Sequence, residues 1–167
     1  PQVNPSFVAQ LIPHQFEVGA PLDLFGARWT PIRLLHGPLP IIGLRVDHDG
    51  HSLAYCTDVS AIPPESHALL AGLDVLVLDA LRYRHHPTHF NVDQALEQID
   101  KIQPGRAYLT HIAHDIRHAE LDAKLPAHVF LSFDGLSVDV PTSSLRCPSA
   151  GSATRPKTPA STGPKGG

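Results

Sequence analysis

The apolar run Val75-Leu76-Val77-Leu78 constrains the fold of this chain more than any other segment. Four consecutive apolar residues that end in Asp79 are typical of a strand that is buried on both faces. A helix is predicted on each side of the run, one over residues 64–71 and one from the N-cap Asn91 through Ile102. A buried strand between two helices predicts an α/β sandwich.

Shorter apolar runs, separated by turn signals, extend this pattern along the chain. The predicted strands cover residues 16–18, 22–25, 29–35, 41–46, 53–56, 75–78, 107–109, 129–133 and 136–140. Asp49-Gly50 and Asp134-Gly135 lie between apolar runs and predict tight turns, and a third, short helix is predicted near 116–123. One domain over residues 1–140 is therefore expected.

Residues 141–167 are rich in Pro, Ser, Thr, Gly and Lys, and too little of the segment is apolar to offset the entropy of ordering it. A disordered tail is predicted there. Its four bases stand without an acid, which favours weak binding of anions over recognition of nucleic acid.

Composition also bears on the cellular setting. The two cysteines, Cys56 in an apolar strand and Cys147 in the tail, do not suggest a disulfide framework, so a reduced, cytoplasmic setting is expected. No apolar run approaches the length of a membrane span, and no signal peptide is visible at the start.

Side chains that can bind metals follow four predicted strands directly. They are His36, Asp58, the cluster from His85 to His89, and His111 with His114. In α/β folds, ligands gather outside the carboxyl ends of the strands. Histidine and aspartate together suit zinc, manganese or iron, and a carboxylate can bridge two ions that activate water and bind the oxygens of a phosphodiester.

Each of these residues also has an ordinary structural explanation. His36 precedes Gly37-Pro38 and fits a turn, and Asp58 fits the cap of a turn. His89 and Asp79 fit caps of the neighbouring elements, and His111 fits a partner of the backbone. The other histidines are predicted to be solvated surface residues: His14, His48, His51, His67, His118 and His128.

The order of six short segments resembles the metallo-β-lactamase-fold hydrolases. Within them it resembles the phosphodiesterase branch, namely the phosphoribosyl cyclic phosphate phosphodiesterase of phosphonate breakdown and, more distantly, tRNase Z. The segments, between about Thr30 and Val138, are Pro31–Gly37, Tyr55–Asp58, Leu78–Leu81, His86–Phe90, Leu109–Asp115 and Phe133–Leu136. The resemblance implies the C-terminal two-thirds of an αββα sandwich and hydrolysis of a small cyclic ribose phosphate.

The resemblance also implies a centre of two divalent metals, zinc or manganese. His36 would be a ligand of the first metal, His111 a ligand of the second, and Asp58 would bridge both. A metal-bound hydroxide would be the nucleophile. Either Arg82, Tyr83 and Arg84 or loops of the absent N-terminal part are expected to form the substrate pocket, although two arginines after a strand are more often simply solvated.

Three further residues receive supporting or catalytic roles from the resemblance. His89 would be the general acid that protonates the leaving oxygen, or it would donate a hydrogen bond to the phosphate as charge develops. His114 would orient His111 or a strand end, and Asp79 would support the same loop.

The family's His-x-His-x-Asp-His motif does not occur in this sequence, and His48-Asp49-Gly50-His51 occupies the wrong place in the order. Without the motif each metal keeps two protein ligands, whereas zinc sites usually have three or four. The sequence therefore leaves three functions open. The first is a fragment of a phosphodiesterase with impaired activity. The second is a degenerate module that pairs an exposed face with a partner or a second copy. The third is thioester or lactone hydrolysis on the same fold.

Overall fold

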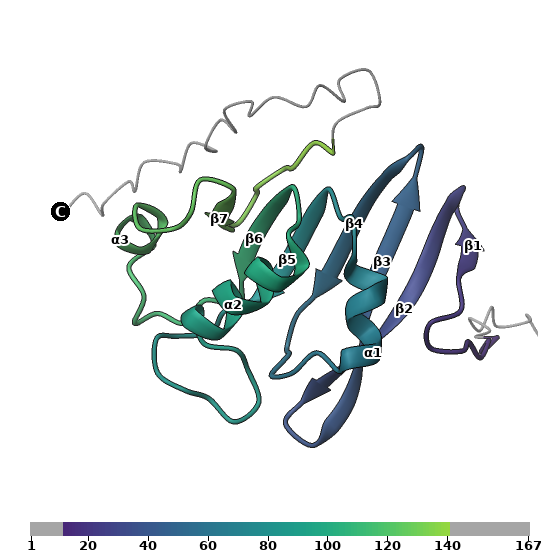
Figure 1. Cartoon of the computed structure of the whole chain (residues 1–167), viewed down its shortest axis with the longest axis horizontal. Coiled ribbons are helices and arrows are strands. Elements are labelled where there is room, and N and C mark those ends of the chain that lie inside the picture. Colours follow the sequence, from purple (N-terminus) through teal and green to yellow (C-terminus); the bar gives the residue numbers. More distant parts are fainter. Residues whose placement is uncertain (1–11, 141–167) are drawn as a thin grey trace, which may run out of the picture.

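A computed structural model describes residues 12–140, so the predicted tail over 141–167 lies outside the described residues. Within that range seven strands form one sheet in the order β1-β2-β3-β4-β5-β6-β7 (Figure 1). Their bounds are β1 Leu22–Leu24, β2 Ala27–His36, β3 Leu39–His48, β4 His51–Cys56, β5 Val75–Asp79, β6 Arg106–Thr110 and β7 Val129–Leu131. Strands β1 to β4 pair antiparallel, and β4 to β7 pair parallel.

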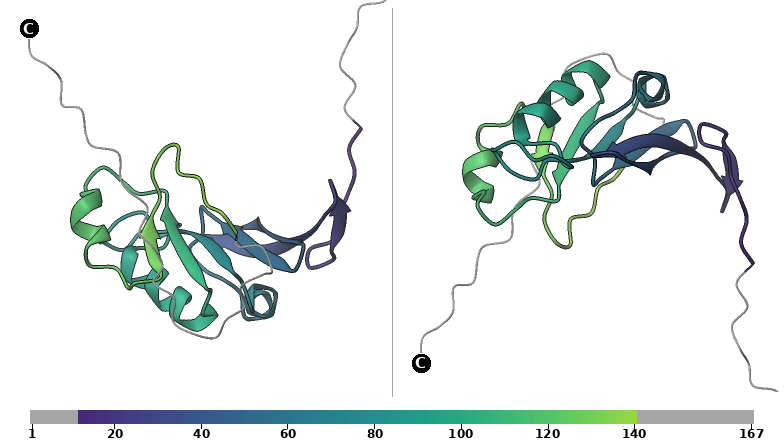
Figure 2. Two further views of the ribbon diagram at one scale, coloured as in Figure 1. Left: turned by 90° about the horizontal axis from the view of Figure 1, so that it is seen from above. Right: turned by 90° about the horizontal axis from the view of Figure 1, so that it is seen from below.

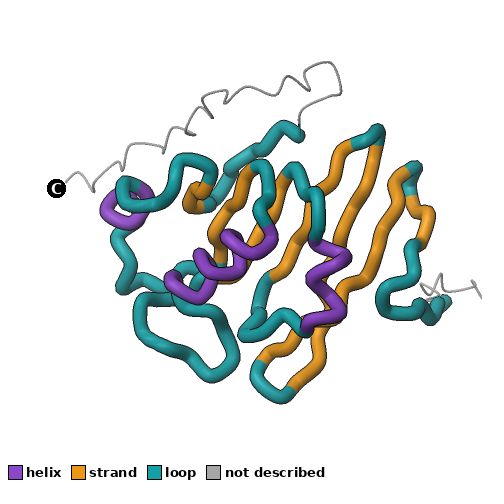
Figure 3. The backbone as a smooth tube through the Cα atoms, viewed as in Figure 1, coloured by secondary structure: helices purple, strands orange, loops and turns teal. Residues whose placement is uncertain are grey.

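Helices account for the crossovers between the parallel strands. Helix α1 (Pro64–His67), with the 3₁₀ turn η1 (Ala68–Leu70), joins β4 to β5, and α2 (Val92–Ile102) joins β5 to β6. Helix α3 (His118–Asp122) lies beside β7. Figures 1, 2 and 3 show α1 and α2 on the same face of the sheet. The predicted α/β fold class is confirmed.

The start of α2 follows the sequence prediction closely. The Asn91 side chain accepts a hydrogen bond from the Gln94 backbone N–H, and the Gln94 side chain accepts one from the Asn91 backbone N–H. This reciprocal capping box satisfies two of the donors that a helix start leaves unpaired. The buried residues of α2 lie at helical spacing and turn toward the sheet: Val92, Ala95, Ile99 and Ile102.

The main hydrophobic core lies between these helices and the sheet. A second, smaller cluster lies on the other face, where Val75, Tyr108 and Phe130 are buried. The chain after β7 covers that cluster with the apolar side chains of Leu136, Val138 and Val140. Figure 2 shows this segment on the face opposite α1 and α2.

Two of the predicted strands are wrong. Residues 136–140 form no strand, because their alternating apolar side chains pack flat on the sheet instead of adding to its ladder. Residues 16–18 form none either, because the chain turns at Gly19, whose φ is +85° and whose N–H donates to the Pro31 carbonyl. Alternating apolar residues indicate that an extended segment buries one of its sides. They do not indicate whether its backbone pairs with a neighbouring strand.

The uncovered part of the second face carries large apolar side chains. Ile42 is 42% exposed, Leu44 36% and Tyr55 51%. Leu44 and Tyr55 are register partners on β3 and β4, so they lie side by side on this face. The described residues thus form one sheet with helices on a single face, as expected for part of a sandwich.

The turn between β3 and β4 has the backbone that its sequence predicts. Asp49 and Gly50 have φ values of +49° and +80°, and positive values at both central residues are typical of a type I′ hairpin turn. The turn sets the register in which His48 faces His51.

Gly43 in β3 is expected to tolerate no larger residue. A Cβ there would lie 2.7 Å from Leu34 Cδ1, 3.1 Å from the Tyr55 carbonyl oxygen and 3.2 Å from Cys56 Sγ. Gly43→Ala should therefore lower the free energy of unfolding by about 1–3 kcal/mol, as overpacking usually does. Urea unfolding measures this. Gly26→Ala is no matched control because of its positive φ, so Ala27→Gly on β2 serves as the mild comparison. An unchanged midpoint for Gly43→Ala would contradict the packing described here.

Candidate functional site

The carboxyl ends of four strands meet at one edge of the sheet. Strands β4, β5 and β6 run parallel, and β2 runs in the same direction because two antiparallel pairings separate it from β4. His36 therefore ends β2 at the edge where Asp58 follows β4, Asp79 ends β5 and His111 follows β6. The loop between β5 and α2 brings His89 to the same edge.

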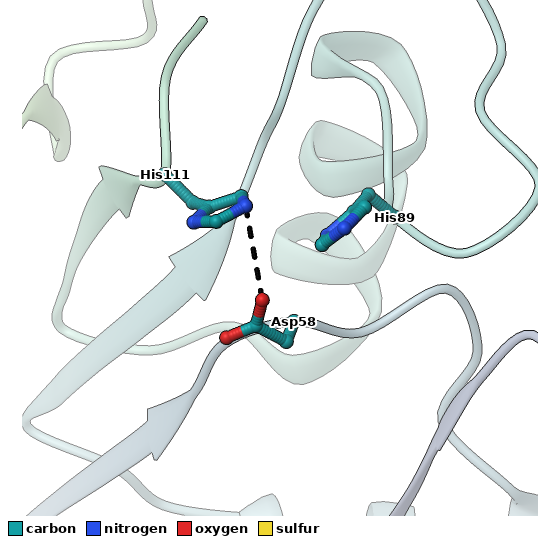
Figure 4. Close-up of side chains that lie close together, drawn as sticks. All are labelled: Asp58, His89 and His111. Atoms are coloured by element: carbon teal, nitrogen blue, oxygen red, sulfur yellow. Dashed lines mark ion pairs between the residues drawn. The ribbon is translucent and has the colours of Figure 1, made fainter. Parts of the chain in front are cut away.

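Asp58, His89 and His111 form the compact group at this edge. Each offers one potential ligand atom, and these atoms all lie within 4.8 Å of one another. His111 Nε2 lies 3.7 Å from Asp58 Oδ1 (Figure 4). The His89 and His111 rings stack with their centroids 4.7 Å apart. Two nitrogens and a carboxylate at this spacing match the donors that divalent metals take in proteins.

Asp58 and His111 both have left-handed backbones, with φ values of +58° and +61°. This region costs non-glycine residues about 1–2 kcal/mol, although aspartate tolerates it better than most. Backbone of this kind tends to gather at functional sites. In the loops after β4 and β6, the left-handed backbone occurs just after the strand ends. It occurs at Asp58 and His111, whose side chains face each other.

His36 lies beside the group rather than within it. Its Nδ1 lies 2.8 Å from the Asp58 carbonyl oxygen, and since a carbonyl only accepts, Nδ1 carries the proton. The unprotonated nitrogen is then Nε2, which is the atom free to bind a metal. The His36 ring meets the His89 ring edge-on, with centroids 4.7 Å apart.

His89 is fixed by a buried aspartate. Its Nδ1 lies 2.7 Å from Asp79 Oδ2, which also accepts a hydrogen bond from the Val59 backbone N–H at 3.1 Å. Burial raises the pKa of the Asp79 carboxyl, and the hydrogen bond and charge of His89 act in the opposite direction. Because Asp79 binds Nδ1 of His89, Nε2 is the nitrogen of this ring that remains available to the site.

His114 lines a separate cavity with Arg82, Arg84 and Asp115. Within residues 12–140 no hydrogen bond joins it to His111. Its supporting role stays a prediction. Of the three residues expected in the substrate pocket, Tyr83 does not line this cavity.

Other histidines differ from the sequence expectation. His51 was predicted to be solvated, but its side chain is 13% exposed and its Nδ1 lies 3.4 Å from Asp74 Oδ2. The ring nitrogens of His118 are likewise buried. His86 was not singled out, yet its ring lies 5.0 Å from that of His89. Its place within the His85–His89 run was the available signal.

Cys56 lies two residues before Asp58 but cannot act as a nucleophile. It is fully buried, and burial raises the pKa of its thiol to about 12. The reactive thiolate form is therefore scarce near neutral pH.

This burial predicts slow labelling of Cys56. In a Cys147→Ser variant, a thiol reagent such as iodoacetamide should modify Cys56 at least about a hundredfold more slowly in the folded protein than in urea. Mass spectrometry over time measures both rates. Similar rates in the two states would show that the β4 core is open.

Comparison with protein families identifies the superfamily of this chain. The family model described as the β-lactamase superfamily domain matches residues 4–112. The chain belongs to the β-lactamase superfamily. Within residues 12–140 of this superfamily member, no helix is long and apolar enough to cross a membrane.

Solved structures that are similar to this β-lactamase superfamily chain include a diphosphatase and a tRNase Z. A diphosphatase of the PhnP family is 41% identical, with a TM-score of 0.68, over 74% of this chain and 46% of its own. Human tRNase Z, short form, is 19% identical with a TM-score of 0.58, over 72% of this chain and 44% of its own, and shows the fold alone. The predicted resemblance to the phosphodiesterase branch of the metallo-β-lactamase fold is confirmed.

A curated relative also matches. An octanoyltransferase of Porphyromonas gingivalis is 32% identical over 121 residues, which make up 70% of this chain and 23% of that protein. The chain thus spans less than half the length of each of these relatives.

Proposed function

We propose that this protein is a metal-dependent phosphodiester hydrolase, acting on a small cyclic ribose phosphate. The observation that carries the proposal is the group of Asp58, His89 and His111, with His89 held by buried Asp79. Its family membership and its similarity to a PhnP-family diphosphatase support the coarser class, a metal-dependent hydrolase.

The residues present fit a divalent metal. Asp58 and His111 face each other at 3.7 Å, and His36 presents Nε2 because Nδ1 is engaged by the Asp58 carbonyl. These three would hold two ions, zinc or manganese, with Asp58 between them. When bound, such ions activate a water molecule and stabilise the charge of a phosphodiester.

The protein's own residues would handle the leaving group. His89 Nε2–H donates its proton to the oxygen that leaves phosphorus, so no alkoxide has to depart. The Asp79 carboxylate accepts the Nδ1–H of the same ring at 2.7 Å and keeps Nε2 directed at the site. The proton lost from His89 is recovered from the water consumed in the reaction.

These residues alone supply fewer ligands than zinc sites usually have. A His-x-His-x-Asp-His motif would add two ligands for each metal, and this motif does not occur in this sequence. We therefore propose that the chain by itself binds metal weakly and hydrolyses slowly.

The second candidate function is an interaction module without activity. The observation that favours it is the uncovered sheet face, where Ile42, Leu44 and Tyr55 are exposed side by side. Apolar patches of this kind commonly mark protein–protein contacts. A second copy of the chain or another protein would cover the face.

Activity and metal content separate the two functions. Full-length protein loaded with zinc or manganese should hydrolyse bis(p-nitrophenyl) phosphate, lose that activity in EDTA and regain it when metal is returned. The 167-residue chain should show a small fraction of this rate. Stoichiometric metal without hydrolysis of any phosphodiester would contradict the hydrolase. No bound metal, together with a stable dimer or complex, would support the module.

A further inference from the structure

The backbone on both sides of His36 is held by Ser60, a residue that the mechanism above does not use. The Ser60 hydroxyl accepts a hydrogen bond from the Gly37 backbone N–H at 2.8 Å. The same hydroxyl donates to the Leu35 carbonyl at 3.2 Å. One side chain therefore binds the residues immediately before and immediately after a candidate metal ligand.

Backbone pairing adds to this hold. Leu35 and Ala61 form an isolated antiparallel bridge, in which the Leu35 N–H donates to the Ala61 carbonyl at 3.0 Å. The Ser60 N–H donates to the Leu35 carbonyl at 2.7 Å. Because β3 lies between β2 and β4 in the sheet, this bridge joins the chain after β4 to the end of a strand that β4 itself does not pair with. The segment that carries Asp58 and the strand that ends in His36 are thus tied together.

The turn that Ser60 holds also touches the loop of His89. Gly37 has a φ of +60°, and a Cβ there would lie 3.0 Å from Thr88 Cγ2. Thr88 directly precedes His89, whose ring meets the ring of His36 edge-on with centroids 4.7 Å apart. A shift of the turn would therefore change how the His36 ring lies against the rest of the site.

His36 needs one particular tautomer to bind a metal through Nε2. Its Nδ1 carries the proton while it donates to the Asp58 carbonyl at 2.8 Å, and Nε2 is then unprotonated. That hydrogen bond depends on the position of the backbone at residues 35–37. We propose that Ser60 is a positioning residue, whose hydroxyl holds this backbone so that His36 keeps Nδ1 on the Asp58 carbonyl and Nε2 for a divalent metal. The part of the proposal that concerns the metal rests on the proposed function.

Ser66 provides a matched comparison on the same strand. Its hydroxyl donates to the Arg33 carbonyl of β2 at 2.7 Å, and its side chain is buried. Arg33 lies three residues before His36, outside the backbone that Ser60 holds. Ser66→Ala therefore removes a hydrogen bond of the same kind from the same strand without releasing His36.

The tautomer of His36 tests the proposal without any metal. The ring nitrogens of metal-free, ¹⁵N-histidine-labelled full-length protein are observed by NMR at pH 8, where an ordinary histidine is neutral. His36→Gln assigns the signals. Wild type and Ser66→Ala should show the Nδ1–H tautomer alone, and Ser60→Ala should show a mixture of both tautomers. Ser60→Thr keeps the hydroxyl and should restore the single tautomer. A wild-type pattern in Ser60→Ala, or a wild type without the Nδ1–H tautomer, would overturn the proposal.

Zinc affinity, measured by competition with a chelating dye, tests the consequence for the site. Ser60→Ala should bind zinc about 3- to 10-fold more weakly than wild type, the usual effect of one neutral hydrogen bond, and Ser66→Ala should bind it as wild type does. Equal zinc affinities for the two variants would overturn the role of Ser60 toward the metal. A wild type that binds no zinc would refute the proposed function alone, and the His36 tautomer would still decide whether Ser60 positions this ring. Ser60→Cys keeps the size of the side chain but is a weak hydrogen-bonding partner, so it replaces Ser60→Ala if that variant does not fold.

Discussion

Replacing His89 with alanine is expected to lower kcat by about 100- to 10,000-fold, the range typical for loss of a general acid. The physical reason is the geometry of the ring. Asp79 binds Nδ1 at 2.7 Å and is fully buried, so Nε2 is the nitrogen available to donate a proton at the site. Stopped assays on a phosphodiester with a poor leaving group measure the effect, because a good leaving group needs less protonation.

Metal content is the necessary companion measurement for His89→Ala. If His89 is the acid, the variant keeps its metals, and His85→Ala in the same loop changes neither metal content nor rate. Loss of metal in His89→Ala would contradict this role. His89 would then be a ligand, which its place within 4.8 Å of the Asp58 and His111 atoms also permits.

Replacing Asp58 with asparagine is expected to weaken metal binding by more than the roughly 10–100-fold seen for residues that only support ligands. Asparagine keeps the size of the side chain and tolerates the left-handed backbone at φ +58°, so folding should survive. What disappears is the negative charge and the second oxygen needed to bridge two ions.

Competition with a chelating dye measures the metal affinity of Asp58→Asn. Asp49→Asn is the matched control, because Asp49 also has a positive φ but lies in the exposed β3–β4 turn. Circular dichroism confirms that both variants fold. An affinity within about threefold of wild type for Asp58→Asn would exclude Asp58 as a metal ligand, since loss of a charged ligand costs far more.

Local rules in the sequence were sufficient for the elements that depend on near neighbours. The capping box of α2 joins Asn91 to Gln94, three residues apart, and the type I′ turn depends only on Asp49 and Gly50. The common edge of the site was also predictable, because parallel strands place their carboxyl ends together.

Features that depend on distant parts of the chain were not predictable in this way. Whether residues 136–140 pair or merely cover the sheet depends on Val75, Tyr108 and Phe130. The enclosure of His51 depends on Asp74, which lies on the approach to β5. For the site itself, a supporting role was predicted for Asp79, but its partner, the ring of His89 ten residues later, was not.

We propose that Asp58 and His111 hold a divalent metal while His89 does not. Anomalous X-ray diffraction at the zinc absorption edge, from crystals of the zinc-loaded full-length protein, tests it most directly. We expect a peak about 2.0–2.2 Å from an Asp58 oxygen and from a His111 nitrogen, with His89 still bound to Asp79. A peak coordinated by His89, or zinc bound only away from Asp58, would contradict it.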